Sequence, residues 1–285
     1  MQKKKTAVPT YLGVAAVWIG SHFGPGFATG AFSVRWYVKY GWGGLVTPLL
    51  AMLITGGVMY FMLEYAREHG TPNYRPFARS CYGEKLGGVV AVLYDICFLM
   101  TMMCAGGLAF SGEGKLLHGF LGVNYWATAI VTILISAALC LYGSKLLAKS
   151  SGYLITILLM VCLIFTLFSY TNVFDVCAET LPVMSVLNRL GMKWLQWLYV
   201  ILMTLAVLTS AAGLAHAGNV RFDGLFRFIK NAQLRRFVIT AILLGIAAVG
   251  AALGFQAMLQ QGTSIVGWAA IPIVVIPAFT IVASK

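Results

Sequence analysis

The chain has 285 residues, of which 60% are apolar and only 10% are charged, and its mean hydropathy is +0.86. This composition excludes an ordinary soluble domain and is typical of an integral membrane protein. The formal net charge of +12 does not indicate a nucleic-acid partner, because the basic residues are spread over the connections between long apolar segments. We therefore expect a lipid bilayer environment and no nucleic acid.

Eight apolar segments are long enough to cross the roughly 30 Å hydrocarbon core of a bilayer, which takes about 20 helical residues. The sequence predicts an all-α, multi-pass membrane protein with one transmembrane domain over residues 1–285. Polar connections are expected at 64–86, 110–125, 172–194 and 218–236. The predicted helices lie near residues 10–32, 43–63, 87–109, 126–147, 152–171, 195–217, 237–257 and 264–283.

The first predicted helix is interrupted by Gly24-Pro25-Gly26. Unwound backbone at membrane depth is tolerated only where protein covers it or where it lines a polar cavity. Interrupted membrane helices also indicate the binding site of a transporter. The alternative is a kinked packing helix, because small residues at 20/24 and 26/30 let a neighbouring helix approach closely.

The third predicted helix contains Asp95, the one acidic residue that we place inside a membrane helix. An intramembrane carboxylate is a functional hypothesis by default. We hypothesise that Asp95 and His22, which lies beside the interruption, form a titratable pair that relays protons. The alternative is a structural carboxyl group that bonds to Tyr94, Thr101 or a neighbour, or that burial keeps protonated.

The sixth predicted helix places Ala206, Thr209 and Ser210 at the spacing i, i+3, i+4, so that they share one helix face. Two hydroxyls and a backbone carbonyl there, together with an unwound first helix, predict half of an oxygen-lined sodium site. The alternative is that these hydroxyls bond back to their own helix or across to a neighbour.

Charge placement predicts the orientation in the cell membrane. Lys3, Lys4 and Lys5 precede the first helix, and most other basic residues fall on the same side, so both termini are predicted to be cytoplasmic. The sequence contains no HExxH zinc motif, no GxSxG elbow and no phosphate-binding GxxxxGK[ST] loop. We therefore expect neither an enzyme nor a cofactor, and no metal beyond sodium.

The eleven residues GSHFGPGFATG, at 20–30, resemble the first-helix signature of the YkvI-like membrane proteins. That family is related to the LeuT-fold transporters of the amino acid-polyamine-organocation type, and the resemblance extends over most of the chain. It implies a transporter of a small, amino-acid-like solute driven by a sodium or proton gradient. The alternative is a non-transporting protein of the same fold that serves as a receptor, regulator or assembly subunit.

The same resemblance implies site residues, because LeuT-fold sodium symporters hold the ion between the broken first helix and a Thr-Ser pair on the eighth. Solute contacts are expected around the interruption. The implied ion ligands are the carbonyls of Gly20, Phe23 and Ala206 and the hydroxyls of Thr209 and Ser210, and the implied solute contacts are Gly24, Pro25, Gly26 and Phe27.

The chain departs from the ten-helix LeuT pattern between Tyr170 and Trp194. This segment is too polar to span a membrane, and it joins the fifth helix directly to the counterpart of the eighth. We therefore expect a partial inverted-repeat bundle without equivalents of core helices 6 and 7. A partner subunit, a homo-oligomer, or an incomplete or altered gene product are the alternatives that explain the gap.

Overall fold

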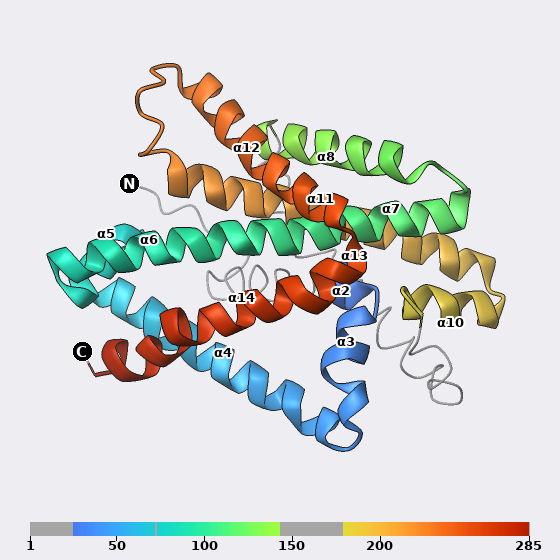
Figure 1. Ribbon diagram of the computed structural model, residues 1–285, viewed down its shortest axis with the longest axis horizontal. Helices are drawn as coiled ribbons and strands as arrows, with labels where there is room; N and C mark the ends of the chain where they lie inside the picture. The colour runs from blue at the N-terminus through green and yellow to red at the C-terminus, as the bar shows by residue number, and fades with distance from the viewer. Residues whose placement is uncertain (1–24, 72, 143–178, 285) are drawn as a thin grey trace, which may run out of the picture.

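The computed structural model describes residues 25–71, 73–142 and 179–284, and the structural statements below concern those residues (Figure 1). All regular elements in these ranges are helices. Six of them are long and apolar enough to cross a membrane, which confirms a multi-pass helical membrane protein and a bilayer environment. These spans are Val46–Glu68, Glu84–Leu121, Tyr125–Tyr142, Lys193–Phe222, Ala232–Leu253 and Phe255–Val282.

The observed spans account for the predicted helices near 43–63, 87–109, 126–147, 195–217, 237–257 and 264–283 as far as the described residues reach. The predicted helix 152–171 and most of 10–32 lie outside them. Three short elements precede the first described span, namely α2 (Pro25–Ala28), α3 (Ala31–Trp36) and η1 (Val38–Tyr40), and α4 (Gly43–Glu68) contains that span.

One prediction is wrong: residues 110–121 are not a connection but continue the third helix. The helix comprises α6 (Glu84–Thr101), a π-helical turn η2 (Met102–Gly106) and α7 (Gly107–Leu121), a continuous span of 38 residues. Its length of about 57 Å exceeds the bilayer core, so it tilts or extends beyond it. The polar and glycine residues of α7 resemble a loop in sequence, but Gly107 and the run Ser111, Gly112, Glu113 and Gly114 are buried.

The remaining elements surround this long helix (Figure 1). In that view α8 and most of α12 lie on one side of it, α11 crosses it, and α4 lies on the other side with the C-terminal segment. Gly254, at a φ of 93°, separates α12 from that segment, and this left-handed conformation favours glycine. The bounds are α5 (Tyr74–Tyr82), α8 (Tyr125–Tyr142), α10 (Pro182–Leu190), α11 (Lys193–Phe222), α12 (Ala232–Leu253), α13 (Phe255–Ala257), η4 (Met258–Gly262), α14 (Thr263–Ala270), η5 (Ile271–Val275) and η6 (Ala278–Val282).

The main core joins η2 and α7 to α11 and α12 through small residues. A Cβ atom added at Gly107 would lie 2.7 Å from the carbonyl carbon of Gly250, and one added at Gly106 would lie 2.6 Å from Cβ of Ala247. Small residues let membrane helices approach closely, and van der Waals packing then supplies the association energy. The crossing holds α7 in the interior, where its polar side chains meet α11.

Candidate functional site

The first predicted helix is discontinuous in its described part. α2 ends at Ala28 and α3 begins at Ala31, and Gly30 between them has a φ of 79°. Only glycine adopts this left-handed conformation without strain. The chain therefore changes direction at Thr29 and Gly30, three residues beyond the predicted interruption at Gly24-Pro25-Gly26, of which Pro25 and Gly26 lie in α2.

Other elements cover the backbone at this break. The Ala28 carbonyl accepts a hydrogen bond from Tyr199 Oη of α11 at 3.1 Å, and the Thr29 carbonyl accepts one from the Val183 amide of α10 at 3.2 Å. The Gly26 carbonyl accepts one from the Thr29 hydroxyl at 2.9 Å. These carbonyls are thus satisfied by protein, which is one of the two conditions under which a break at membrane depth is stable.

The predicted solute contacts lie partly within this region. Gly26 is buried, and Phe27 is half-buried with its ring stacked on Phe32 at a centroid distance of 5.3 Å. Pro25 begins α2. The other predicted residues of this helix, namely Gly20, His22, Phe23 and Gly24, lie outside the described residues, so the roles assigned to them stay predictions.

The sequence analysis missed a second intramembrane carboxyl group, that of Glu113 in α7. Its side chain is fully buried. Oε1 accepts a hydrogen bond from the Thr204 hydroxyl of α11 at 2.5 Å, while Oε2 is buried without a hydrogen-bond partner among the described residues. The sequence contained one signal for this position. Leu116 and Leu117 follow Glu113 at the i+3 and i+4 spacing of an apolar helix face, which indicates that the helix continues through Glu113.

Glu113 lies next to the break in the first helix. A Cβ atom added at the preceding Gly112 would lie 3.2 Å from the Phe255 ring and 4.0 Å from the Thr29 methyl group. α11 contacts both the break and Glu113, since the Tyr199 hydroxyl donates to the Ala28 carbonyl and the Thr204 hydroxyl donates to Glu113. The tertiary structure therefore gathers the break, a buried carboxyl group and two hydroxyls into one region.

A cavity of about 290 Å³ adjoins this region, between α7 and residues 179–188. Lys115, two residues beyond Glu113, lines the cavity with a basic side chain. Glu179 lines it with an acidic one. Three further polar side chains contribute, namely Thr180, Ser185 and Asn188. The cavity thus offers a cation, an anion and neutral hydrogen-bonding groups to a small ligand.

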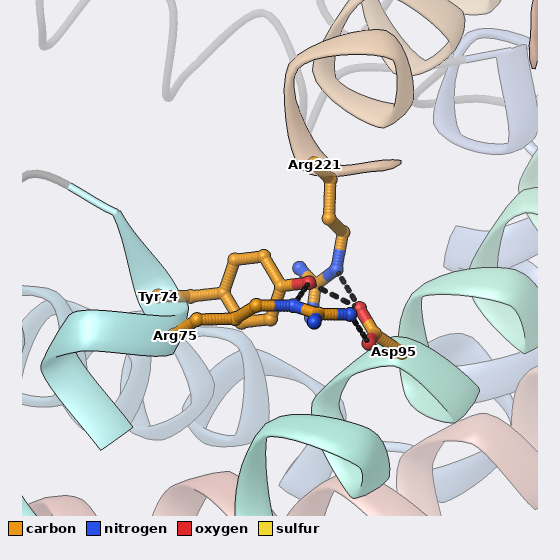
Figure 2. A network of polar contacts seen from close by, with 4 residues as sticks. All are labelled: Tyr74, Arg75, Asp95 and Arg221. Atoms are coloured by element: carbon orange, nitrogen blue, oxygen red, sulfur yellow. Dashed lines mark hydrogen bonds and ion pairs between the residues drawn. The ribbon is translucent and has the colours of Figure 1, made fainter. Parts of the chain in front are cut away.

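Asp95 belongs to a separate, ionic cluster (Figure 2). Oδ1 accepts hydrogen bonds from Arg221 Nε at 2.8 Å and from the Tyr74 hydroxyl at 2.5 Å, and Oδ2 accepts one from Arg75 Nη2 at 2.9 Å. Figure 2 shows these side chains converging from α5, α6 and α11. The carboxylate is thus paired with neighbouring helices, which agrees with that part of the structural alternative, and not with Tyr94 or Thr101, which the alternative also named.

The side chains around Asp95 also contact one another. The Arg221 guanidinium carbon lies 3.6 Å from the centroid of the Tyr74 ring, and Arg75 Nε donates to the Tyr74 hydroxyl at 2.9 Å. Burial raises the pKa of Tyr74, and the hydrogen bond with Tyr74 raises the pKa of Arg75. Both shifts keep these groups in the protonated forms that donate to Asp95.

The predicted ion ligands of α11 form bonds within their own helix. The Thr209 hydroxyl donates to the carbonyls of Leu205 at 2.9 Å and Ala206 at 3.2 Å. Thr209 is ten residues from Tyr199, or about 15 Å along the helix, so it does not meet the described break. Because Gly20 and Phe23 lie outside the described residues, the sodium site with Ser210 stays a prediction.

Two polar links therefore connect the same pair of long helices at different depths. Asp95 meets Arg221 at one level, and Glu113 meets Thr204 at the other. The carboxyl groups are eighteen residues apart on one continuous helix, or about 27 Å. One link is a charged pair, whereas the other leaves a buried carboxyl oxygen without a hydrogen-bond partner in the part of the chain that the structure describes.

Comparison with known proteins gives a distant relative. The chain is similar to an uncharacterized membrane protein, YkvI, of Bacillus subtilis (strain 168), with 22% identity over 155 residues. The aligned region makes up 53% of this chain and 42% of YkvI, so the chain matches less than half the length of that relative. No family model matches the chain, and no solved structure matches it significantly.

Proposed function

We propose that the chain is part of a membrane transporter of a small, amino-acid-like solute, driven by a proton gradient. The observation that supports this most is the fully buried Glu113 carboxyl group, whose Oε2 has no hydrogen-bond partner among the described residues. Burying an ionised carboxylate without full pairing is costly, and the cost is far smaller for the protonated acid. Such groups inside membrane proteins mark proton and substrate pathways.

The position of Glu113 supports coupling between the proton and the solute. Leu116, one helical turn further along α7, lines the 290 Å³ cavity, and the break contacts Val183 of α10, whose neighbours Met184 and Ser185 line the same cavity. In the proposed cycle Glu113 takes up a proton when the solute occupies the cavity and releases it on the opposite side of the membrane. A movement at the break, where Gly30 joins two short helices, is the accompanying conformational change.

The cavity supports a zwitterionic solute. Lys115 suits a carboxylate and Glu179 suits an ammonium group, so one amino-acid-like molecule can satisfy both. A volume of about 290 Å³ lies near the lower end of ligand pockets, which favours a small solute. We further propose that both termini are cytoplasmic and that a partner subunit or a second copy of the chain completes the pathway.

Uptake into proteoliposomes tests the proposal. Vesicles containing the full chain and an internal pH-sensitive dye receive an inward proton gradient and each of the twenty amino acids as probes. We expect at least one probe to be concentrated and to accelerate internal acidification. Glu113→Gln should reduce proton-driven accumulation at least tenfold, while Glu84→Gln, an exposed carboxylate on the same helix, should not change it.

Two outcomes would contradict the proposal. Wild-type accumulation by Glu113→Gln would exclude this carboxyl group as the coupling site. Saturable binding of a probe without accumulation under any ion gradient would favour the receptor alternative. The sodium alternative predicts accumulation under a sodium gradient alone and sodium-dependent thermal stabilisation that is lost when Thr209→Ala and Ser210→Ala are combined.

A further inference from the structure

A second cavity, of about 430 Å³, lies at the Asp95 end of the structure and has no part in the proposed transport cycle. α4, α5, α6, α11 and the C-terminal segment enclose it, and most of its lining is apolar. The polar lining comes mainly from Thr71, Asn73, Tyr74 and Arg221. The apolar lining includes Met62, Leu63, Phe77, Phe98, Val266 and Val274.

The charge beside this cavity is not balanced. Two guanidinium groups, those of Arg75 and Arg221, share the single carboxylate of Asp95. Asp223, two residues beyond Arg221, pairs instead with Arg235 at 2.6 Å. Counted over the described residues, the cluster therefore carries one excess positive charge next to an apolar space, where the low dielectric strengthens attraction for an anion.

Three buried polar atoms of lining residues have no hydrogen-bond partner among the described residues, namely those of Thr71, Tyr94 and Arg221. Arg221 uses Nε for Asp95, but its Nη2 is buried and unpaired. The Thr71 hydroxyl is also buried and unpaired, in a residue that is only 9% exposed. Buried donors without partners cost free energy, so an acceptor that enters the cavity and reaches Arg221 and Thr71 would be stabilised.

We propose that this cavity binds an anionic amphiphile, with its carboxylate or phosphate head on Arg221 and Thr71 and its acyl chain among the apolar side chains. Guanidinium groups favour these planar or multidentate oxyanions. An amino acid is less suited, because both oxygens of Asp95 are already occupied and no carboxylate is left for its ammonium group. The neighbouring span of α4 is largely exposed, which gives acyl chains access from the lipid.

Binding to the full chain in nanodiscs of neutral phosphatidylcholine tests the proposal. Radiolabelled decanoate is the first probe, lysophosphatidylglycerol is the second, and decyl maltoside is the uncharged control. We expect saturable binding of an anionic probe at one site, and Arg221→Gln should weaken it at least tenfold. Arg227→Gln removes an exposed arginine just beyond Arg221 and should leave binding unchanged.

A second variant distinguishes loss of the binding site from misfolding, because Arg221→Gln also breaks the ion pair with Asp95. Ala66→Phe fills the cavity from α4 and leaves the arginine in place, and it should also reduce binding at least tenfold. Binding of decanoate supports a free fatty acid as ligand, and binding of lysophosphatidylglycerol alone supports a lipid head group. The proposal is overturned if neither anion binds saturably, if decyl maltoside binds equally well, or if Ala66→Phe binds like the wild type.

Discussion

The crossing of α7 and α12 at Gly107 provides a sharp test of the packing. A Cβ atom at Gly107 would lie 2.7 Å from the carbonyl carbon of Gly250, 2.9 Å from its Cα atom and 3.1 Å from the Ala251 amide nitrogen. All three are backbone atoms, so no side-chain rotation relieves the overlap. Gly107→Ala therefore forces the two helices apart by roughly 1 Å to restore ordinary contact distances.

The expected cost follows from two opposing terms. Overpacking a close interface costs about 1–3 kcal/mol, and a contact with rigid backbone belongs at the upper end of that range. Alanine gains about 1 kcal/mol over glycine in helix propensity. Subtracting the gain from the cost, we expect Gly107→Ala to lower the free energy of unfolding by about 2 kcal/mol. The packing around Ala247 and Ala251 is the part of the core that the separation weakens.

The matched control is Gly88→Ala, because Gly88 lies on the same continuous helix and a Cβ atom there would meet nothing within 4 Å. It should leave stability unchanged or raise it by up to about 1 kcal/mol. Unfolding of both variants by sodium dodecyl sulfate, followed by far-ultraviolet circular dichroism in maltoside micelles, measures the difference. Equal stability of the two variants would refute the close approach of α7 and α12.

Three further predictions use the same unfolding assay. Asp95→Asn should cost about 3 kcal/mol, because two guanidinium groups lose their carboxylate, whereas the exposed Glu84→Gln should have little effect; equal effects would contradict the ion-pair cluster. Thr204→Val should cost about 1–3 kcal/mol by removing the donor to the buried carboxyl group, and a similar loss from Thr209→Val, which only breaks bonds within its own helix, would contradict this reasoning. Burial raises the pKa of Tyr74 above its ordinary value of 10.0, so its contribution to stability is present below that pH and is lost as the pH rises through the higher folded-state pKa. Tyr74→Phe should therefore make the alkaline loss of stability shallower, and an unchanged slope would contradict the assignment.

Several features followed from local sequence alone. Long apolar runs predicted the membrane class and the six described spans, because crossing a bilayer requires about 20 apolar residues in any fold. The glycines around Pro25 predicted a discontinuous first helix, but in its described part the turn lies at Gly30, whereas Pro25 and Gly26 lie in α2. These properties depend on residues that are neighbours in the chain.

The partners of the polar groups were decided by tertiary structure. Asp95 meets Arg221, 126 residues away, and not a neighbour along its own helix. Glu113 was mistaken for part of a polar connection, because a helix face that is polar and rich in glycine has the same composition whether it meets water or other helices. Hydrophobic periodicity reports how polar a face is, while only the packing of α11 and α12 around α7 determines that this face is buried.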